Sequence, residues 1–212
     1  LVQNGQVKQA AIDFQAYKES AAKLVGYPYF DFFRHPASML SRKDLLERLG
    51  FPADARYILY TSGSAYCPDE PDVIDSILSW IDQGFFGNNI YFVLRPYVGG
   101  RSKDRELDVR KFKKIIAHPK VYNYDKMNWD NLENSIFFIN VIRHAALMMS
   151  VYSTIFLEAV MLDRPLVAAV FDGYKKRPYG QSVRRFEAFS HFREFIKLGA
   201  IKRTFSFDEL KA

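Results

Sequence analysis

Three hydroxyl side chains and one carboxylate lie close together in the last third of the chain, at Ser150, Ser153, Thr154 and Glu158. They follow an apolar run at 146–149, which favours a buried strand, and they lead into an apolar segment that favours a helix. Ser153 or Thr154 is expected to cap this helix, because a hydroxyl oxygen can accept from an unpaired backbone N–H group. Such a helix start can hold a phosphate, and Glu158 could accept from a ribose diol. An ordinary capped helix with a surface acid is the alternative.

Two further groups follow predicted strands. Ser62, Gly63 and Ser64 come after the apolar run 57–61, where the glycine permits close backbone approach and the serines can donate to an anion. Arg95 comes after the run 89–94, and arginine binds phosphate in a forked geometry. A tight turn and a surface ion pair are the alternatives for these two groups. The chain contains neither a G-x-G-x-x-G fingerprint nor a P-loop.

The histidines and the cysteine predict no metal site. No two of the four histidines have the spacing of metal ligands, and Cys67 has no second cysteine to join it. His144 is expected to be structural or capping. The basic residues at 175–177, with Arg184 and Arg185, either close over an anionic ligand or form a solvated loop. The histidines are His35, His118, His144 and His191.

The elements that must position these groups alternate between strands and helices. Strands are expected at 57–61, 89–94, 121–124, 146–149, 166–170 and 200–202. Helices are expected at 70–81, 104–117, 131–142, after Thr154, at 183–198 and from Ser206. The helix after Thr154 is apolar almost all round, which predicts that it is buried. This alternation predicts an α/β fold, a Rossmann-like three-layer αβα sandwich with a mostly parallel sheet of about six strands. The carboxyl ends of parallel strands meet at one edge, where ligands bind.

Residues 1–40 are expected to be separate from a domain at 41–212. A helix is predicted over 7–24, and the turn formers at 26–31 are typical of a linker between lobes. A short helix should start after Ser41, as N-cap, and end before Gly50.

Composition sets the class of protein. The 212 residues suffice for one good-sized domain, and no apolar run approaches the roughly 20 residues that span a bilayer. The net charge of +6 permits an anionic ligand, a nucleic acid or an anionic membrane surface as partner, and a solvated basic surface is the alternative. A single cysteine fits a reducing cytosol, so a cytoplasmic location is expected. The first residue is Leu, so the chain is expected to be a fragment.

Several segments, in order, resemble the carboxyl-terminal lobe of GT-B glycosyltransferases. The likeness is greatest to the branch that includes CDP-glycerol glycerophosphotransferases and non-hydrolysing UDP-N-acetylglucosamine 2-epimerases. The segments are Val25-Gly26-Tyr27-Pro28-Tyr29-Phe30-Asp31, Tyr57-Ile58-Leu59-Tyr60-Thr61-Ser62-Gly63-Ser64, Ser150-Val151-Tyr152-Ser153-Thr154-Ile155, Glu158-Ala159, Asp163-Arg164-Pro165-Leu166-Val167 and Ser206-Phe207-Asp208-Glu209-Leu210.

This resemblance implies a donor nucleotide site. Ser153 and Thr154 would hold the donor diphosphate and Glu158 the ribose. The other donor-binding residues would be Ser62, Gly63, Ser64, Arg95, Ser150 and Tyr152. The donor would be a UDP- or CDP-linked substrate, with no metal and no further cofactor. Tyr97 replaces the histidine of the family's R/K-P-H-P run, and Ser150 replaces the first acid of its E-x7-E pattern. No catalytic residue is therefore assigned.

The function expected from the resemblance is group transfer from a nucleoside-diphosphate donor to an acceptor, in cell envelope biosynthesis. The amino-terminal lobe with the acceptor site would lie outside this chain, which should be inactive alone. The full-length protein could associate peripherally with the inner face of the membrane, and no nucleic acid is expected as partner. A sugar-nucleotide epimerase and a non-catalytic nucleotide- or phosphate-binding domain remain alternatives. The sequence specifies neither base, sugar nor acceptor.

Overall fold

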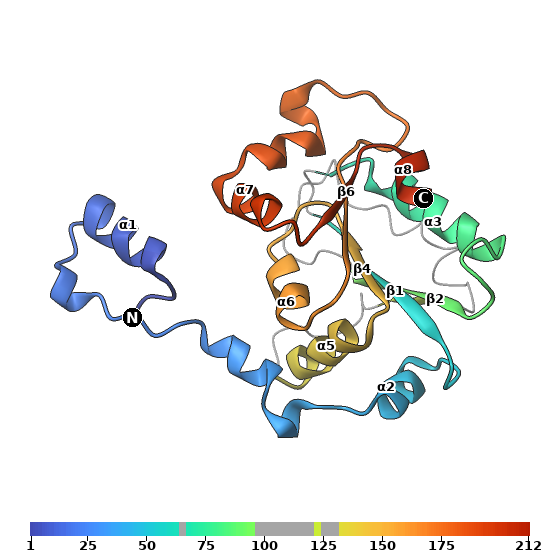
Figure 1. The fold of residues 1–212 in the computed structure, drawn as a ribbon, viewed down its shortest axis with the longest axis horizontal. Coiled ribbons are helices and arrows are strands. Elements are labelled where there is room, and N and C mark those ends of the chain that lie inside the picture. Colours follow the sequence, from blue (N-terminus) through green and yellow to red (C-terminus); the bar gives the residue numbers. More distant parts are fainter. Residues whose placement is uncertain (64–66, 96–120, 124–131) are drawn as a thin grey trace. The chain divides into compact units, whose positions relative to one another are not determined.

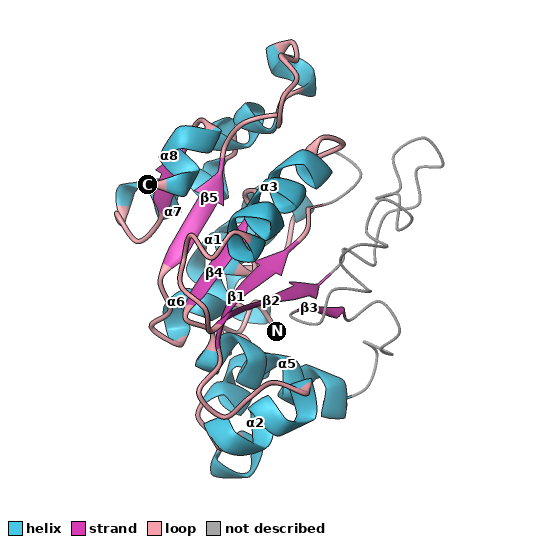
Figure 2. Ribbon diagram, turned by 90° about the vertical axis from the view of Figure 1, so that its right-hand side faces the viewer, coloured by secondary structure: helices cyan, strands magenta, loops and turns pink. Residues whose placement is uncertain are grey.

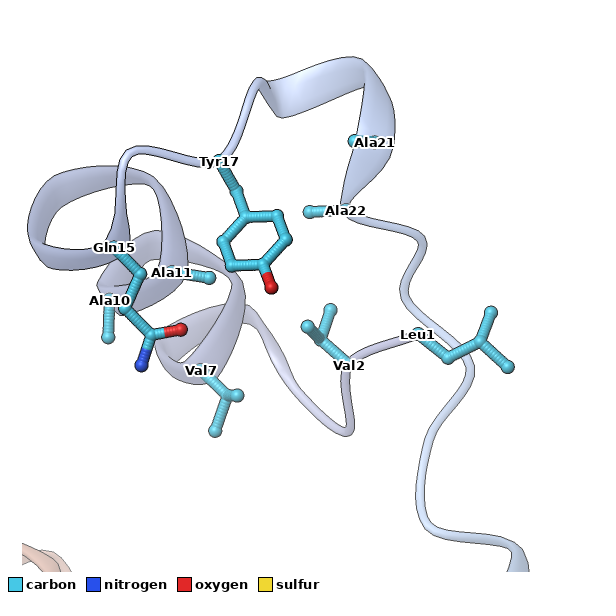
Figure 3. A pocket seen from close by; sticks show the side chains of 9 residues that line it. All are labelled: Leu1, Val2, Val7, Ala10, Ala11, Gln15, Tyr17, Ala21 and Ala22. Atoms are coloured by element: carbon cyan, nitrogen blue, oxygen red, sulfur yellow. The ribbon is translucent and has the colours of Figure 1, made fainter.

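The computed structural model describes residues 1–63, 67–95, 121–123 and 132–212 (Figure 1). The chain divides into a small unit, Leu1–Met39, and a larger unit, Leu40–Ala212. The small unit contains helix α1 (Gly5–Gln15) and three short 3-10 helices, η1 (Glu19–Ala21), η2 (Pro28–Phe33) and η3 (Pro36–Ser38). Its pocket of about 300 Å³ lies between α1 and the segment around Ala22, with the Tyr17 ring and Val2 at its centre (Figure 3).

The helix predicted over 7–24 is wrong beyond Gln15. Ala16 has a left-handed backbone, with φ of 56°, which ends α1. The following segment returns to form a parallel bridge between Val2 and Leu24, so its backbone is extended there. This pairing between distant positions competes with local helix propensity and overrides it.

The larger unit is built on one parallel sheet. Its strands are β1 (Arg56–Thr61), β2 (Ile90–Arg95), β3 (Val121–Asn123), β4 (Leu147–Ser150), β5 (Leu166–Ala169) and β6 (Lys202–Thr204). They are arranged in the order β3-β2-β1-β4-β5-β6, and every neighbouring pair is parallel. The predicted parallel sheet of about six strands is confirmed. The last strand starts two residues later than expected, because Lys202 to Thr204 pair with β5.

Helices cover both faces of the sheet, which confirms the three-layer Rossmann-like architecture (Figures 1 and 2). The helices are α2 (Arg42–Leu49), α3 (Glu70–Asp82), α5 (Leu132–His144), α6 (Phe156–Met161), α7 (Ser190–Lys197) and α8 (Phe207–Lys211). Successive strand residues point to opposite faces, so β1 contributes Leu59 to one core and Tyr60 to the other. The first core packs against α2, α5, α6 and α7, and the second against α3 and α8.

Helix ends follow the local sequence where a cap is available. The Ser41 side chain accepts from the Asp44 N–H, and Gly50 has φ of 70° after α2, as predicted. The helix predicted over 183–198 is instead a 3-10 helix, η5 (Val183–Ala188), followed by α7. Phe186 and Phe192 are both buried in the same core, and on one continuous helix residues six apart would lie on different sides. The extended Phe189 between them lets both rings reach the core.

Candidate functional site

The carboxyl edge of the sheet contains the point at which the strand order reverses. From β1 the chain proceeds outward to β2 and β3, whereas from β4 it proceeds the other way to β5 and β6. In open parallel sheets ligands bind in the crevice outside this point. β1 and β4 end here at Thr61 and Ser150, which are in register, and Arg95 at the end of β2 is the partner of Thr61 on its other side.

Arg95, Thr61 and Ser150 form a polar row across these three strand ends. Each lies two positions after a residue that packs in the core against α5 and α6, namely Val93, Leu59 and Met148. Because side chains alternate along a strand, the polar row faces the same layer of helices. The tertiary structure therefore brings together two predicted site residues, Arg95 and Ser150, with Thr61 between them.

The polar row is partly bonded within the protein. The Ser150 hydroxyl is buried and donates to the Thr61 carbonyl at 2.6 Å, which joins the ends of β1 and β4. Arg95 is half-buried, and its guanidinium carbon lies 4.3 Å from the ring centroid of Phe138 on α5. Thr61 is 3% exposed, and among the described residues its side-chain oxygen has no hydrogen-bond partner.

The turn between β4 and α6 differs from the prediction. Neither Ser153 nor Thr154 caps the helix, because the N-cap residue is Ile155. Backbone carbonyls take over the role of the cap: the N–H groups of Phe156 and Leu157 donate to the carbonyls of Ser153 and Thr154. The Ser153 hydroxyl accepts only a long bond of 3.5 Å from the Ile155 N–H. Thr154 is exposed and Ser153 half-buried, so both hydroxyls lie where a ligand could contact them.

Helix α6 is less buried than its composition predicts. Phe156 and Ala159 are fully buried, but Leu157, Val160 and Met161 are each about two-fifths exposed. The six-residue helix packs one side on the core, so an apolar composition all round does not bury its outer side. Glu158, the expected ribose ligand, is half-buried on this helix.

Tyr152 connects the β4–α6 turn to η5 and, through Glu187, to β6. Its hydroxyl donates to Glu187 Oε1 at 2.7 Å, and Arg203 Nη1 donates to the same oxygen at 3.0 Å. Burial and the Glu187 carboxylate raise the pKa of Tyr152, so the phenol stays neutral and donates. The Tyr152 ring also lies 5.1 Å from Phe192. In this arrangement the Tyr152 hydroxyl is bonded to the protein itself.

The loop after β1 is occupied by an internal carboxyl group. The Gly63 N–H donates to both carboxyl oxygens of Glu70, at 2.9 and 2.8 Å, and the Tyr60 hydroxyl donates to one of them at 2.9 Å. The Ser62 N–H donates to the Arg95 carbonyl. Burial raises the pKa of Glu70 to about 8, although these hydrogen bonds favour the charged form and by themselves lower the pKa. The N–H groups of Ser62 and Gly63 are thus committed to the protein itself.

The basic residues after β5 pair with acids at the start of α3. Arg177 and Lys175 both bind the buried Asp69 carboxylate, and the Tyr174 N–H donates to Asp72. Hydrogen bonding to Arg177 lowers the pKa of Asp69. In the sequence, a proline with acids around it is typical of a helix N-terminus and indicates the start of α3. This pattern did not identify the basic residues that bind those acids.

Some predicted features lie outside the described residues: Ser64, Tyr97, His118 and the helix at 104–117. Within the described part, no cluster of three or more His, Cys, Asp or Glu side chains could hold a metal ion. His144 contacts the Leu40 carbonyl through Nε2 at 3.0 Å, and burial lowers its pKa. None of the helices in the described ranges combines the length and the apolar composition of a membrane-spanning segment.

Comparison with known proteins shows similarity in structure alone. No protein-family model and no curated protein sequence matches the chain. The chain superposes on UDP-GlcNAc 2-epimerase of Methanocaldococcus jannaschii, solved with UDP-GlcNAc and UDP, with a TM-score of 0.53 and 14% identity over 93% of this chain and 48% of that chain. For S. aureus MnaA, solved with UDP, the TM-score is 0.54, with 12% identity over 95% of this chain and 45% of that one.

A variant of the wall teichoic acid polymerase TagF gives a TM-score of 0.51 and 14% identity, over 79% of this chain and 38% of the polymerase. At these identities the likeness shows the fold. The larger unit has a GT-B-like, Rossmann-type fold, which confirms at the level of architecture the resemblance seen in the sequence. The chain spans about half the length of the epimerase.

Proposed function

We propose that the larger unit binds a nucleoside-diphosphate donor at the carboxyl edge of β1 and β4, as the donor lobe of a glycosyltransferase or glycerophosphotransferase. The observation that carries the proposal is the polar row at the reversal of strand order, with the accessible hydroxyls of Ser153 and Thr154 directly after it. The GT-B-like fold supports this, because the similar structures include enzymes solved with UDP or with UDP-GlcNAc.

Each proposed role follows from side-chain chemistry. The hydroxyls of Ser153 and Thr154 donate to phosphate oxygens, and Glu158 accepts from the ribose diol. Arg95 offsets the negative charge that develops on the departing diphosphate, as a fixed cation can when water is excluded. The proposed donor is UDP- or CDP-linked, and this set of groups operates without a metal. Acceptor binding, envelope biosynthesis and contact with the inner membrane face belong in this proposal to a longer protein.

An epimerase acting on a sugar nucleotide is the second candidate, because one similar structure is a UDP-GlcNAc 2-epimerase. Both functions need the same donor site. They differ in whether the sugar changes when no acceptor is present, which NMR of a UDP-GlcNAc sample incubated with the full-length protein would measure. Epimerisation without acceptor would favour the second candidate over the transferase.

Differential scanning fluorimetry tests the donor site directly. A ligand that binds only the folded state must raise its melting temperature. UDP, CDP, GDP, ADP and a short oligonucleotide should be compared at two salt concentrations. We expect UDP or CDP to stabilise the chain at both. Stabilisation by the oligonucleotide alone, lost at high salt, would contradict the proposal and indicate nucleic-acid binding.

Thr154→Ala provides the matching variant, because Thr154 is exposed and its loss should not affect folding. We expect it to weaken UDP or CDP binding several-fold at an unchanged melting temperature of the free protein. Ser190→Ala, which removes another exposed hydroxyl on the same unit, is the control. Equal nucleotide affinity in both variants would place the diphosphate elsewhere.

A further inference from the structure

We propose that Thr61 is a further ligand-binding residue, whose hydroxyl donates to a phosphate oxygen of the donor beside Arg95. This inference rests on the proposed function and extends it to a residue whose side chain had no assigned role. The position of Thr61 is central: it lies between Arg95 and Ser150 in the polar row, at the end of β1 where the strand order reverses.

The Thr61 hydroxyl is a buried donor that lacks an acceptor among the described residues. Thr61 is 3% exposed, and within the described ranges its side-chain oxygen makes no hydrogen bond. Nearly all buried polar atoms in native proteins are bonded, and an unsatisfied one costs free energy. Thr204, the corresponding threonine at the end of β6, shows the usual arrangement: it is buried, and its hydroxyl donates to the Ala168 carbonyl at 3.1 Å.

The groups around Thr61 determine which chemical class of partner its hydroxyl can bind. The Ser150 proton is committed to the Thr61 carbonyl, and the Ser62 N–H to the Arg95 carbonyl. The Arg95 guanidinium has donors only, so it cannot accept the Thr61 proton. An acceptor that satisfies the hydroxyl and also suits the neighbouring cation carries negative charge. A phosphate oxygen meets both requirements, and a sugar hydroxyl meets only the first.

The Thr61 hydroxyl must become accessible before a ligand can reach it. A side chain that is 3% exposed meets a ligand only when a neighbour turns aside. Arg95 is the long side chain of the row, half-buried and resting on the Phe138 ring through a cation–π contact. A diphosphate can bind the guanidinium in a bidentate geometry, and this interaction competes with the contact to the Phe138 ring. We expect this turn of Arg95 to open the path to Thr61.

The test is a pair of substitutions at Thr61 with UDP, CDP and inorganic pyrophosphate as probes. Thr61→Val keeps the shape and removes the hydroxyl, and Thr61→Ser restores it. Calorimetry should show a dissociation constant at least about tenfold weaker in Thr61→Val, and close to wild type in Thr61→Ser. The melting temperature of the free protein should stay equal or rise in Thr61→Val, because no existing bond is lost.

Thr204→Val is the matched control, since it removes a buried hydroxyl that is bonded. It should lower the melting temperature and leave nucleotide affinity unchanged. If wild type binds none of the three probes, the proposed function itself fails. If wild type binds and Thr61→Val binds equally well, this inference is overturned and the proposed function remains.

Two further outcomes would also overturn the inference. A clear fall in the melting temperature of free Thr61→Val would mean that the hydroxyl already has a partner inside the protein, such as a buried water. Weaker nucleotide binding with unchanged pyrophosphate binding would mean that the hydroxyl contacts ribose or base and not phosphate. Parallel weakening of all three probes is the result that we expect.

Discussion

At the level of single residues, Glu70 holds the loop after β1. Its carboxyl group accepts from the Gly63 N–H and the Tyr60 hydroxyl while fully enclosed, at 3% exposure. Burial raises its pKa from 4.5 to about 8, because the charged form loses its hydration. The group that holds the Gly63 N–H is therefore an internal acid which keeps its proton near neutral pH.

The first prediction concerns Glu70 and pH. Between pH 4.5 and about 8 the unfolded chain releases this proton and the folded chain keeps it, so stability falls as pH rises. The contribution is up to about 1.4 kcal/mol per pH unit. Urea denaturation across this pH range should show that the free energy of unfolding falls more steeply with pH in wild type than in Glu70→Gln, whose amide does not titrate. Glu47→Gln, at an exposed site, should keep the wild-type slope. An identical slope in all three proteins would contradict the assignment.

The second prediction concerns the close packing at Gly63. A Cβ at this position would lie 2.6 Å from Val151 Cγ2 and 2.8 Å from the Cys67 sulfur. We expect Gly63→Ala to lower the free energy of unfolding by about 1–3 kcal/mol, as overpacked cores do. Gly180→Ala is the control, because nothing lies within 4 Å of its Cβ position. Equal stability of the two variants would show that the Gly63 site can relax.

At the level of elements, the loop after β5 is held against the start of α3. Asp69 is buried and binds Arg177 and Lys175. The hydroxyl groups of Tyr174 and Ser76 lie 3.0 Å apart. These contacts join segments about a hundred positions apart in sequence, so they position the carboxyl side of β5 relative to the β1 loop.

The third prediction tests this attachment. Among the described residues, Arg177→Ala leaves Lys175 as the only cation bound to the buried Asp69 carboxylate, and it should lower the free energy of unfolding by about 1–3 kcal/mol. Chymotrypsin should also cut faster at the exposed Tyr174 and Tyr179. Lys176→Ala changes the adjacent, exposed cation and should behave as wild type. Equal cleavage rates in the two variants would mean that the ion pair does not hold the loop.

At the level of the whole molecule, the chain divides at Met39 into two units. The larger unit has both of its hydrophobic cores within residues 40–212. A domain with its own core can fold alone. The fold likeness also concerns this architecture of a parallel sheet between helical layers.

The fourth prediction follows from this division. A protein of residues 40–212 should unfold cooperatively, with a melting temperature within about 4 °C of the full chain, the shift that roughly 1 kcal/mol produces in a domain of this size. Its near-UV circular dichroism should retain the signals of its buried aromatic rings. A broad transition or exposed hydrophobic surface would show that the small unit is needed for folding.

Local patterns were sufficient for most of the elements. Apolar runs marked β1 and β2, the caps Ser41 and Gly50 marked the ends of α2, and the start of α8 was expected at Ser206, because each depends on contacts within a few residues. The patterns failed where distant contacts decide the backbone. The bridge between Val2 and Leu24 shortens α1, and the burial of two phenylalanines breaks the segment 183–198.

The sequence by itself determined the class of fold and the edge of the sheet on which polar groups would gather, because strand and helix periodicity are local and parallel strands share a carboxyl edge. Only the tertiary structure decided which of these groups are already bonded to the protein. The Gly63 N–H is bonded to Glu70 at the start of the next helix, the Tyr152 hydroxyl is bonded to Glu187 on another segment, and Thr61 has an enclosed hydroxyl between two neighbouring strands. Hydrogen-bond partners depend on positions in space that no spacing along the chain encodes.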